Sequence, residues 1–317
     1  MTLRLSVASA PWHQHVASTA AAYGEMIPVV KGNGYGFGRS ELMAHACGLS
    51  PTVAVGSVFE AHEVPSTHTA LVLTPAGIDL PKSLPSQAVL TIGARHHVDT
   101  LRNTGWRGAV VVKLQSAMRR YGASADELSS LLESLNKAAL TQVGWSVHPP
   151  LDGTSSNHVA DVSRWLSQVG VQHPMYISHL DSGAVQKLRK SFPQHRIIAR
   201  IGTSLWLGDK TQLQLHADVL DIHTVDAGMT AGYRNVKITT DGSLVLVGAG
   251  SAHGVHTVDN QLSPFHFQKT RLQLLEPSHM HTSMLFVANG SPCPLVGDLV
   301  EVQQPLTRVA VDTIYWT

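Results

Sequence analysis

Short apolar segments that alternate with helical patterns constrain the fold of this chain more than any other feature. Eight such segments occur up to residue 201. They are short, rich in Val and Ile and apolar on both faces, as in a parallel sheet covered by helices. They are Met26–Lys31, Thr52–Gly56, Ala70–Leu73, Ala88–Ile92, Ala109–Leu114, Gln142–Val147, Met175–Ser178 and Ile197–Ile201. The pattern predicts an α/β fold with a (β/α)8 TIM-type barrel, and a doubly wound open sheet is the alternative.

Two of the connecting segments carry clear helix signals. Ser124 and Glu127 have the spacing of a capping box ahead of a leucine-rich run. From Ser155 to Val169, apolar residues recur on one helical face. Both signals fit helices between barrel strands.

The pattern changes near residue 215, where helical periodicity fades. Val236–Thr240 and Leu244–Val247 alternate like strands, and Asp241-Gly242 between them predicts a hairpin. Further strand-like runs are Met284–Val287, Asp298–Val302 and Arg308–Tyr315. We therefore expect a barrel domain over residues 1–215 and a C-terminal all-β domain over 216–317.

Composition makes several classes of protein poor candidates. Lys and Arg total 23 against 22 Asp and Glu, with no basic run, so nucleic-acid and membrane-surface partners are poorly supported. No apolar run approaches the length of a membrane span, and no signal peptide is expected. The distant Cys47 and Cys293 suggest no disulfide framework, which favours a cytoplasmic location.

The first predicted strand ends on Lys31, which a glycine-rich turn with Asn33 and Tyr35 follows. In such barrels the active site lies at the carboxyl ends of the strands. A lysine among apolar neighbours is biased toward the neutral amine, a nucleophile that can form a Schiff base. The alternative is a strand-end lysine that reaches solvent.

The stretch from Val29 to Gly38, Val-Val-Lys-Gly-Asn-Gly-Tyr-Gly-Phe-Gly, resembles the cofactor-lysine motif of alanine racemases. Those are pyridoxal 5'-phosphate (PLP) enzymes with a barrel followed by a β domain. Further motifs follow in the family's order over nearly the whole chain. The resemblance implies that Lys31 forms the Schiff base with PLP and that Tyr35 reaches its phosphate.

The stretch from Lys113 to Gly122 is similar to a second family motif. By that resemblance Lys113 is a lysine that can be carbamylated, and Arg120 supports the substrate carboxylate. The family usually has Asp-Thr-Gly where this chain has Gln115-Ser116-Ala117.

Two strand ends match further cofactor-binding motifs. His148 resembles the family histidine that contacts an arginine beneath the cofactor ring. Ser182, in Ser178–Gly183, resembles the serine of a phosphate-binding loop. Ser182 as a plain helix N-cap is the alternative, since both use the same geometry.

Arg200 resembles the family arginine that meets the pyridine nitrogen of the cofactor. A guanidinium donates there without losing its proton, so the ring becomes a weaker electron sink and side reactions are disfavoured. Gly202 and Thr203 would place backbone N–H groups near the phosphate.

Racemisation needs proton transfer on both faces of the α-carbon. Tyr233, in Ala231–Arg234, resembles the family's second acid/base opposite the lysine. In the family this tyrosine comes from the other subunit of a head-to-tail homodimer. The alternative is a turn or sheet-edge tyrosine.

The match weakens around His279–Met284, which aligns with Cys-Met-Asp-Gln-x-Met in the family. Met280, whose backbone N–H meets the substrate carboxylate in the family, is kept, whereas His281 replaces the aspartate. A family tyrosine is also missing from Val247–Gly254. The pair His279 and His281 leaves a metal site open as an alternative, without a complete ligand set.

The sequence as a whole predicts a PLP-dependent racemase of a small amino acid, alanine above others, that supplies D-alanine by a two-base mechanism without a metal. The alternatives are a racemase of another amino acid, a metal-assisted PLP aldolase or dehydratase acting on D-hydroxy amino acids, and a catalytically silent PLP-binding homologue.

Overall fold

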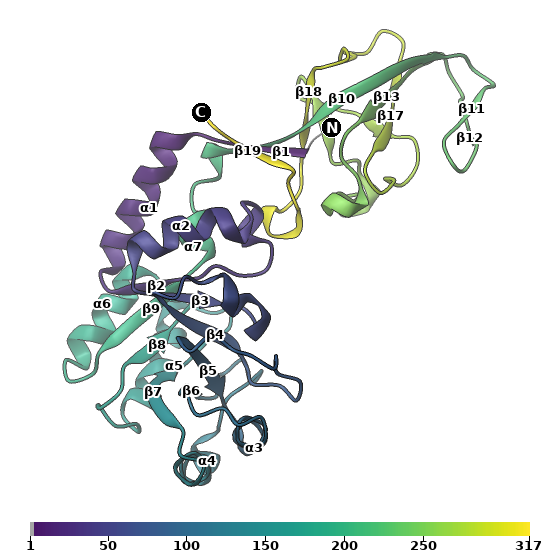
Figure 1. Ribbon diagram of the computed structural model, residues 1–317. Helices are drawn as coiled ribbons and strands as arrows, with labels where there is room; N and C mark the ends of the chain where they lie inside the picture. The colour runs from purple at the N-terminus through teal and green to yellow at the C-terminus, as the bar shows by residue number, and fades with distance from the viewer. Residues whose placement is uncertain (1–2) are drawn as a thin grey trace. The chain divides into compact units, whose positions relative to one another are not determined.

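The computed structural model describes residues 3–317 and divides into two compact units (Figure 1). The barrel unit consists of His15–Gly32 and Arg39–Gly208. The β unit consists of the residues up to Gln14, Asn33–Gly38 and Asp209–Thr317. The division at residue 215 expected from the sequence remains a prediction.

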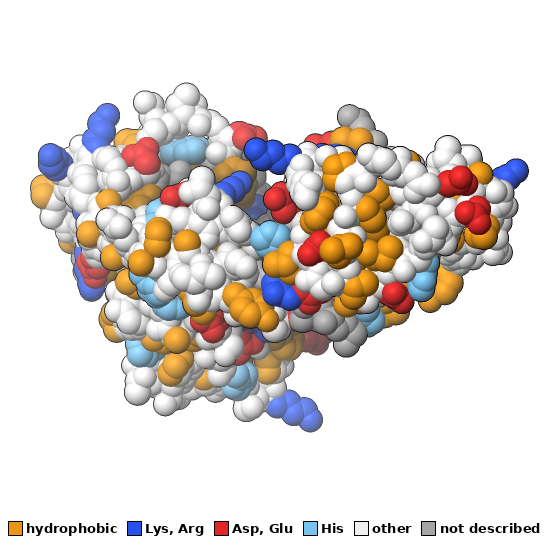
Figure 2. Space-filling view, turned by 90° about the horizontal axis from the view of Figure 1, so that it is seen from above, with side chains coloured by type: hydrophobic (Ala, Val, Ile, Leu, Met, Phe, Trp, Pro, Cys, Tyr) orange, Lys and Arg blue, Asp and Glu red, His pale blue; other side chains and the backbone are white. Residues whose placement is uncertain are grey.

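The surface shown in Figure 2 carries Lys and Arg side chains scattered among acidic and neutral ones. None of the helices formed by residues 3–317 is both long enough and apolar enough to cross a membrane.

Eight parallel strands form the barrel sheet in the order β2-β9-β8-β7-β6-β5-β4-β3. They are β2 (Met26–Pro28), β3 (Thr52–Val55), β4 (Thr69–Pro75), β5 (Ala88–Ile92), β6 (Ala109–Lys113), β7 (Thr141–Ser146), β8 (Met175–Ile177) and β9 (Ile197–Ile201). A parallel bridge between Val29 and Ala54 joins the two ends of this order, so the sheet nearly closes. The barrel prediction is confirmed, and the open doubly wound sheet is excluded.

The helices in chain order are α1 (Ser9–Tyr23), α2 (Arg39–Leu49), α3 (Arg95–Asn103), α4 (Ala125–Lys137), α5 (Ser155–Leu166), α6 (Ser182–Ser191) and α7 (Thr203–Trp206). The capping box ahead of α4 is present, because Ser124 and Glu127 bond each other's backbone N–H. Strict alternation of strand and helix was wrong at two connections. A 3-10 helix (Val58–Glu63) follows β3, and residues 76–87 after β4 form no helix. Pro81 and Pro85 account for the second departure, since proline removes a helical hydrogen bond.

Apolar side chains fill the barrel interior at the level of the strands. Those buried there are Ile27, Val29, Ala54, Leu71, Val89, Val111 and Ile198. Close packing of this kind leaves little freedom to the strands. Their carboxyl ends are thereby fixed in relation to one another.

The main sheet of the β unit has nine strands. Seven follow the order β15-β14-β18-β10-β13-β17-β16, and β1 pairs with both β10 and β19. Their bounds are β1 (Leu3–Val7), β10 (Leu213–Val225), β13 (Gly242–Val247), β14 (Phe265–Phe267), β15 (Thr270–Arg271), β16 (Gln273–Leu274), β17 (Ser283–Ala288), β18 (Leu299–Val302) and β19 (Thr313–Trp316). A separate two-stranded ribbon joins β11 (Thr230–Ala231) to β12 (Val236–Lys237).

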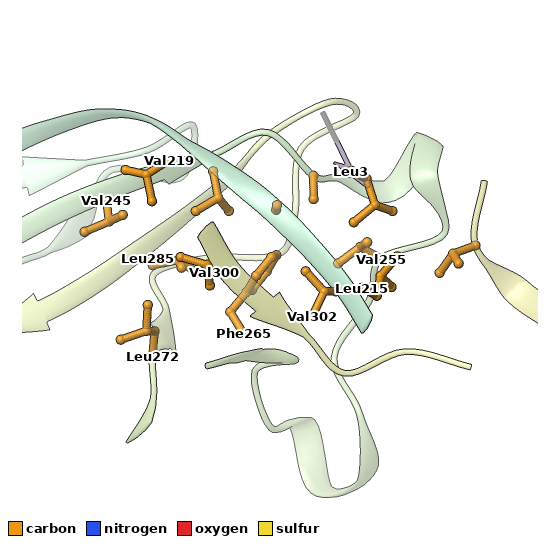
Figure 3. Packing of buried hydrophobic residues seen from close by; sticks show 14 of the residues in the cluster. Leu3, Leu215, Val219, Val245, Val255, Phe265, Leu272, Leu285, Val300 and Val302 are labelled. Atoms are coloured by element: carbon orange, nitrogen blue, oxygen red, sulfur yellow. The ribbon is translucent and has the colours of Figure 1, made fainter. Parts of the chain in front are cut away.

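The larger of two buried clusters described in this unit is drawn in Figure 3. Figure 3 shows Phe265 lying among Val300, Val302 and Leu285, all of them nearly or fully buried. Leu3 belongs to the same cluster, so residues near both ends of the chain contribute to one core.

The predicted hairpin across Asp241-Gly242 was wrong. β13 pairs with β10 and β17, whereas β12 pairs with β11. Gly242 is the first residue of β13, where a side-chain carbon would come within 2.4 Å of the Val287 carbonyl oxygen. The Asp241 carboxylate accepts a bond from the Ala227 backbone N–H at 2.8 Å. Close strand approach, rather than a tight turn, therefore explains the glycine.

Candidate active site

Polar side chains gather where the barrel strands end. Lys31 follows β2, Lys113 ends β6, His148 follows β7 and Ser178 follows β8, while Arg200 lies within β9. Parallel barrel strands end on one face. The structure thus brings together most of the barrel residues selected from the sequence.

Lys31 has a pKa below its usual value. Burial is the largest cause, and the charges of Arg120 and Arg200 lower the pKa further, whereas Glu60 raises it. Glu60 also accepts bonds from the backbone N–H groups of Gly32 at 3.2 Å and Gly56 at 2.6 Å. The carboxylate therefore fixes the backbone that follows Lys31, although its side chain was not selected from the sequence.

Lys113 is buried, with 5% of its surface exposed. Burial lowers the pKa of its ammonium to about 7, and the charges of Arg200, Arg120 and Lys31 act in the same direction. A substantial share of Lys113 is therefore the neutral amine near pH 7.

Arg200, Ser178 and His148 form a hydrogen-bonded chain. Arg200 Nη2 donates to Ser178 Oγ at 3.2 Å, and Ser178 Oγ lies 2.5 Å from His148 Nδ1. Burial, followed by the Arg200 charge, lowers the pKa of His148 to about 2, so its imidazole is neutral. A neutral ring can accept the serine proton at Nδ1. Ser178, which the sequence motif contained without marking it, links the predicted histidine and arginine.

Arg200 also has an unused donor. Its Nη2 donates to the Val147 carbonyl oxygen at 3.0 Å, but its buried Nε has no acceptor within residues 3–317. Burial lowers the pKa of Arg200 only to about 10, so the guanidinium remains charged at neutral pH. A buried cationic donor of this kind requires an acceptor. A ligand with an acceptor atom at Nε would supply it.

The loop that carries Arg120 is anchored to α5. Trp165 Nε1 donates to the Gln115 carbonyl oxygen at 2.7 Å, and the Ala117 backbone N–H donates to Asp161 Oδ2 at 2.9 Å. These bonds hold the segment where the sequence departs from the Asp-Thr-Gly pattern. Arg120 itself is exposed.

The predicted phosphate-binding residues lie at the starts of two helices. Ser182 is the first residue of α6, and Asp181 is its N-cap, accepting a bond from the Ala184 N–H at 2.8 Å. The interpretation of Ser182 as the N-cap was therefore wrong. Gly202 precedes the single-turn α7, which begins at Thr203.

Three other selected residues belong to the β unit. Tyr35 is buried and has a φ of 55°, in the left-handed region that is uncommon outside glycine. Tyr233 lies in the turn between β11 and β12 with 84% of its surface exposed. The Met280 carbonyl oxygen accepts a bond from the Ala252 N–H at 2.8 Å.

The two histidines of the weakened motif have different neighbours. His279 Nε2 lies 2.6 Å from Glu276 Oε1, whereas the His281 ring lies edge-on to His253 with centroids 5.8 Å apart. Across residues 3–317, no group of three or more His, Cys, Asp or Glu side chains is arranged to hold a metal. The described residues therefore offer no set of ligands in support of a metal-assisted aldolase or dehydratase.

Comparison with solved structures supports the fold. The chain matches alanine racemase from Bartonella henselae, solved with covalently bound pyridoxal phosphate, with a TM-score of 0.74 and 18% identity over 99% of both chains. It matches biosynthetic alanine racemase from Pseudomonas aeruginosa with a TM-score of 0.71 and 19% identity, over 100% of this chain and 99% of the other. For alanine racemase from Bacillus anthracis with bound L-Ala-P the TM-score is 0.71 and the identity 19%, over 95% of this chain and 85% of the other. No curated protein sequence matches the chain.

A family model supplies the family assignment. The model described as alanine racemase, N-terminal domain, matches residues 13–209, which is more than half of the chain. That range contains every barrel strand and all the strand-end side chains described above. The chain therefore belongs to the alanine racemase N-terminal domain family.

Proposed function

We propose that this protein is a PLP-dependent amino-acid racemase that interconverts L- and D-alanine with Lys31 and Tyr233 as its two bases. The observation that carries the proposal is the convergence of Lys31, Lys113 and Arg200 at the carboxyl ends of the barrel strands. The charge of Arg120 acts on both lysines.

The residues at the strand ends fit a phosphorylated pyridine. Their cationic charge favours an anionic ligand, because like charges at close range repel unless a counter-charge is present. The unpaired Nε of Arg200 suits an uncharged ring nitrogen as its acceptor. Lys31 would attach the cofactor through its amine. Tyr35 and the backbone of the segments that begin at Ser182 and Gly202, with Thr203, would bind the phosphate.

When bound, PLP withdraws electrons from the α-carbon of an attached amino acid and makes its hydrogen acidic. The Lys31 amine, once the substrate amine has replaced it on the cofactor, would take that proton from one face. The hydroxyl of Tyr233 delivers its own proton to the opposite face. Lys31 then holds one proton more and Tyr233 one fewer, and reaction in the other direction, or exchange through solvent, restores both.

Side chains around the two bases would orient the reaction. Arg200 keeps its proton and donates a hydrogen bond, which limits electron withdrawal and disfavours side reactions. His148 stays neutral and, through Ser178, fixes the guanidinium. Arg120 and the backbone N–H of Met280 would bind the substrate carboxylate.

The exposure of Tyr233 favours assembly from two copies. A phenol that is 84% exposed cannot exclude water from its own proton transfer. We propose a head-to-tail homodimer in which Tyr233 completes the site of the partner copy, and we expect the enzyme to act in the cytoplasm. Gel filtration with light scattering tests the dimer.

The experiment for the function combines a spectrum with a chiral assay. Protein incubated with PLP should absorb at about 420 nm, and Lys31→Ala should lose that band. The matched control is Lys137→Ala, at the exposed end of α4. L-alanine should yield D-alanine with the wild type, whereas Tyr233→Phe should keep the band and lose the reaction.

If the protein forms no D-alanine from L-alanine, the assignment of alanine as its substrate is wrong. A panel of serine, lysine and arginine would then test whether His281, in place of the family aspartate, goes with another substrate. Activity that a chelator abolishes and a divalent metal restores would instead support an aldolase or dehydratase.

A further inference from the structure

The ribbon that carries Tyr233 is too short to hold the tyrosine by itself. β11 and β12 form only two residue pairs, Thr230 with Lys237 and Ala231 with Val236. Figure 1 shows this ribbon beyond the ends of β10 and β13. Isolated two-stranded ribbons are marginal in water even when longer. Something else must therefore fix the turn between the two strands.

A buried carboxylate fixes it. The Glu276 side chain, 2% exposed, follows β16 and accepts bonds from two successive backbone N–H groups of the turn. Tyr233 N donates to Oε1 at 2.8 Å, and Arg234 N donates to Oε2 at 3.0 Å. Gly232 permits this approach, because a side-chain carbon there would lie 2.3 Å from Oε1. The turn is built around the carboxylate.

The same carboxylate holds an imidazole against the tyrosine ring. His279 Nε2 lies 2.6 Å from Glu276 Oε1, and the His279 and Tyr233 rings lie 4.2 Å apart at 31° between their planes. Burial raises the pKa of Glu276, but the bonds from His279, Tyr233 and Arg234 outweigh it and leave the pKa below its usual value. The carboxylate therefore stays ionised and binds the backbone and the imidazole together.

We propose that Glu276 and His279 are positioning residues for the second base: the carboxylate fixes the backbone of Tyr233, and the imidazole packs on its ring. The inference rests on the proposed function of Tyr233. Its physical basis is the contrast between an exposed phenol and a nearly fully buried support. A catalytic hydroxyl must keep its place within about 1 Å, since a larger error costs on the order of 10²-fold in rate.

The test compares Glu276→Gln with a matched control, Glu301→Gln, an exposed glutamate of β18 that has no role in the site. In Glu276→Gln the amide NH2 must face a backbone N–H donor, that of Tyr233 or that of Arg234. We expect kcat to fall by roughly 10²-fold, with KM nearly unchanged and the band at about 420 nm retained. One enantiomer should still exchange its α-hydrogen with deuterated solvent and keep its configuration, because the Lys31 face is intact.

A second variant and a second measurement separate this inference from the proposed function. His279→Ala leaves both backbone bonds to Glu276 in place, so it should fold and lose only the ring contact. Protein labelled with 3-fluorotyrosine reports the six tyrosines by fluorine NMR, with Tyr233→Phe identifying one signal. That signal should shift toward the value of an unfolded chain in Glu276→Gln, shift less in His279→Ala, and stay in Glu301→Gln.

The outcomes divide cleanly. An unmoved fluorine signal, or unchanged kcat in Glu276→Gln, rejects the positioning role while the racemase function stands. A shifted signal in a protein that racemises no amino acid supports the role of Glu276 in fixing the turn at Tyr233 and rejects the proposed racemase function.

Discussion

Ser178 Oγ lies 2.5 Å from His148 Nδ1, and the same oxygen accepts a bond from Arg200. One hydroxyl thus sets the orientation of a neutral imidazole and of a buried guanidinium. A serine lone pair faces the arginine, and an uncharged His148 can accept the serine proton at Nδ1.

Ser178→Ala should weaken cofactor binding. The variant removes an acceptor from buried Arg200, and a lost hydrogen bond to a charged group costs about 1.5–3 kcal/mol. We expect roughly 10- to 100-fold weaker PLP binding, measured by titration of the band at about 420 nm. Ser167→Ala, at the exposed end of α5, should bind PLP like the wild type.

Burial of Lys113 should make the ligand-free protein more stable as the pH rises from neutral to alkaline. Its folded pKa of about 7 lies below the ordinary 10.5, so between these values the unfolded chain binds more protons. The free energy of unfolding therefore rises with pH across that window, while below it the full cost of the buried charge is present.

Lys113→Met should flatten this rise and stabilise the ligand-free protein near pH 7. Urea unfolding at about pH 7, 8.5 and 10 measures both effects. Lys137→Met, at an exposed site, is the control. A wild-type stability that stays level from neutral to alkaline pH would contradict the prediction.

Asp161→Ala should loosen the loop that carries Arg120. The Ala117 N–H loses its acceptor, at a cost of about 0.5–1.5 kcal/mol for a bond of this kind. We expect KM for the amino acid to rise by a few-fold with the cofactor band unchanged. Asp126→Ala, in the first turn of α4, tests whether any surface aspartate has the same effect.

Gly250→Ala should destabilise the β unit. A side-chain carbon there would lie 2.2 Å from the His279 carbonyl oxygen and 2.6 Å from that of Met280. Overpacking of this kind costs typically 1–3 kcal/mol, so thermal unfolding should shift down by several degrees. Gly77→Ala, where no atom lies within 4 Å, should melt with the wild type.

The sequence predicts the barrel well because each strand carries its own apolar signal. The capping-box spacing of Ser124 and Glu127 also located the start of α4. The β unit was harder, since its pairings join segments distant in the chain. Asp241-Gly242 has the local chemistry of a turn, but the partners that make Gly242 part of a strand are Val225 and Ala288.

The same limit applies to the site. Strand-end lysines and arginines can be found from spacing, whereas the partners that hold them cannot. Glu276 was overlooked because its role depends on backbone groups of Tyr233 and Arg234, which the chain brings to it only after folding. Ser178 was overlooked because a serine at a strand end has no distinctive pattern.

The pairing of β1 with β19 has a consequence for how the protein is made. Arg4 to Val7 lie beside Thr313 to Trp316 in one parallel pair, so this pair joins strands that are far apart in the chain. A ribosome releases β1 and its other neighbour β10 well before β19 exists, and an unpaired strand edge invites association with other chains. Barrel strands can pair during synthesis, but the sheet of the β unit is complete only after β19 has emerged.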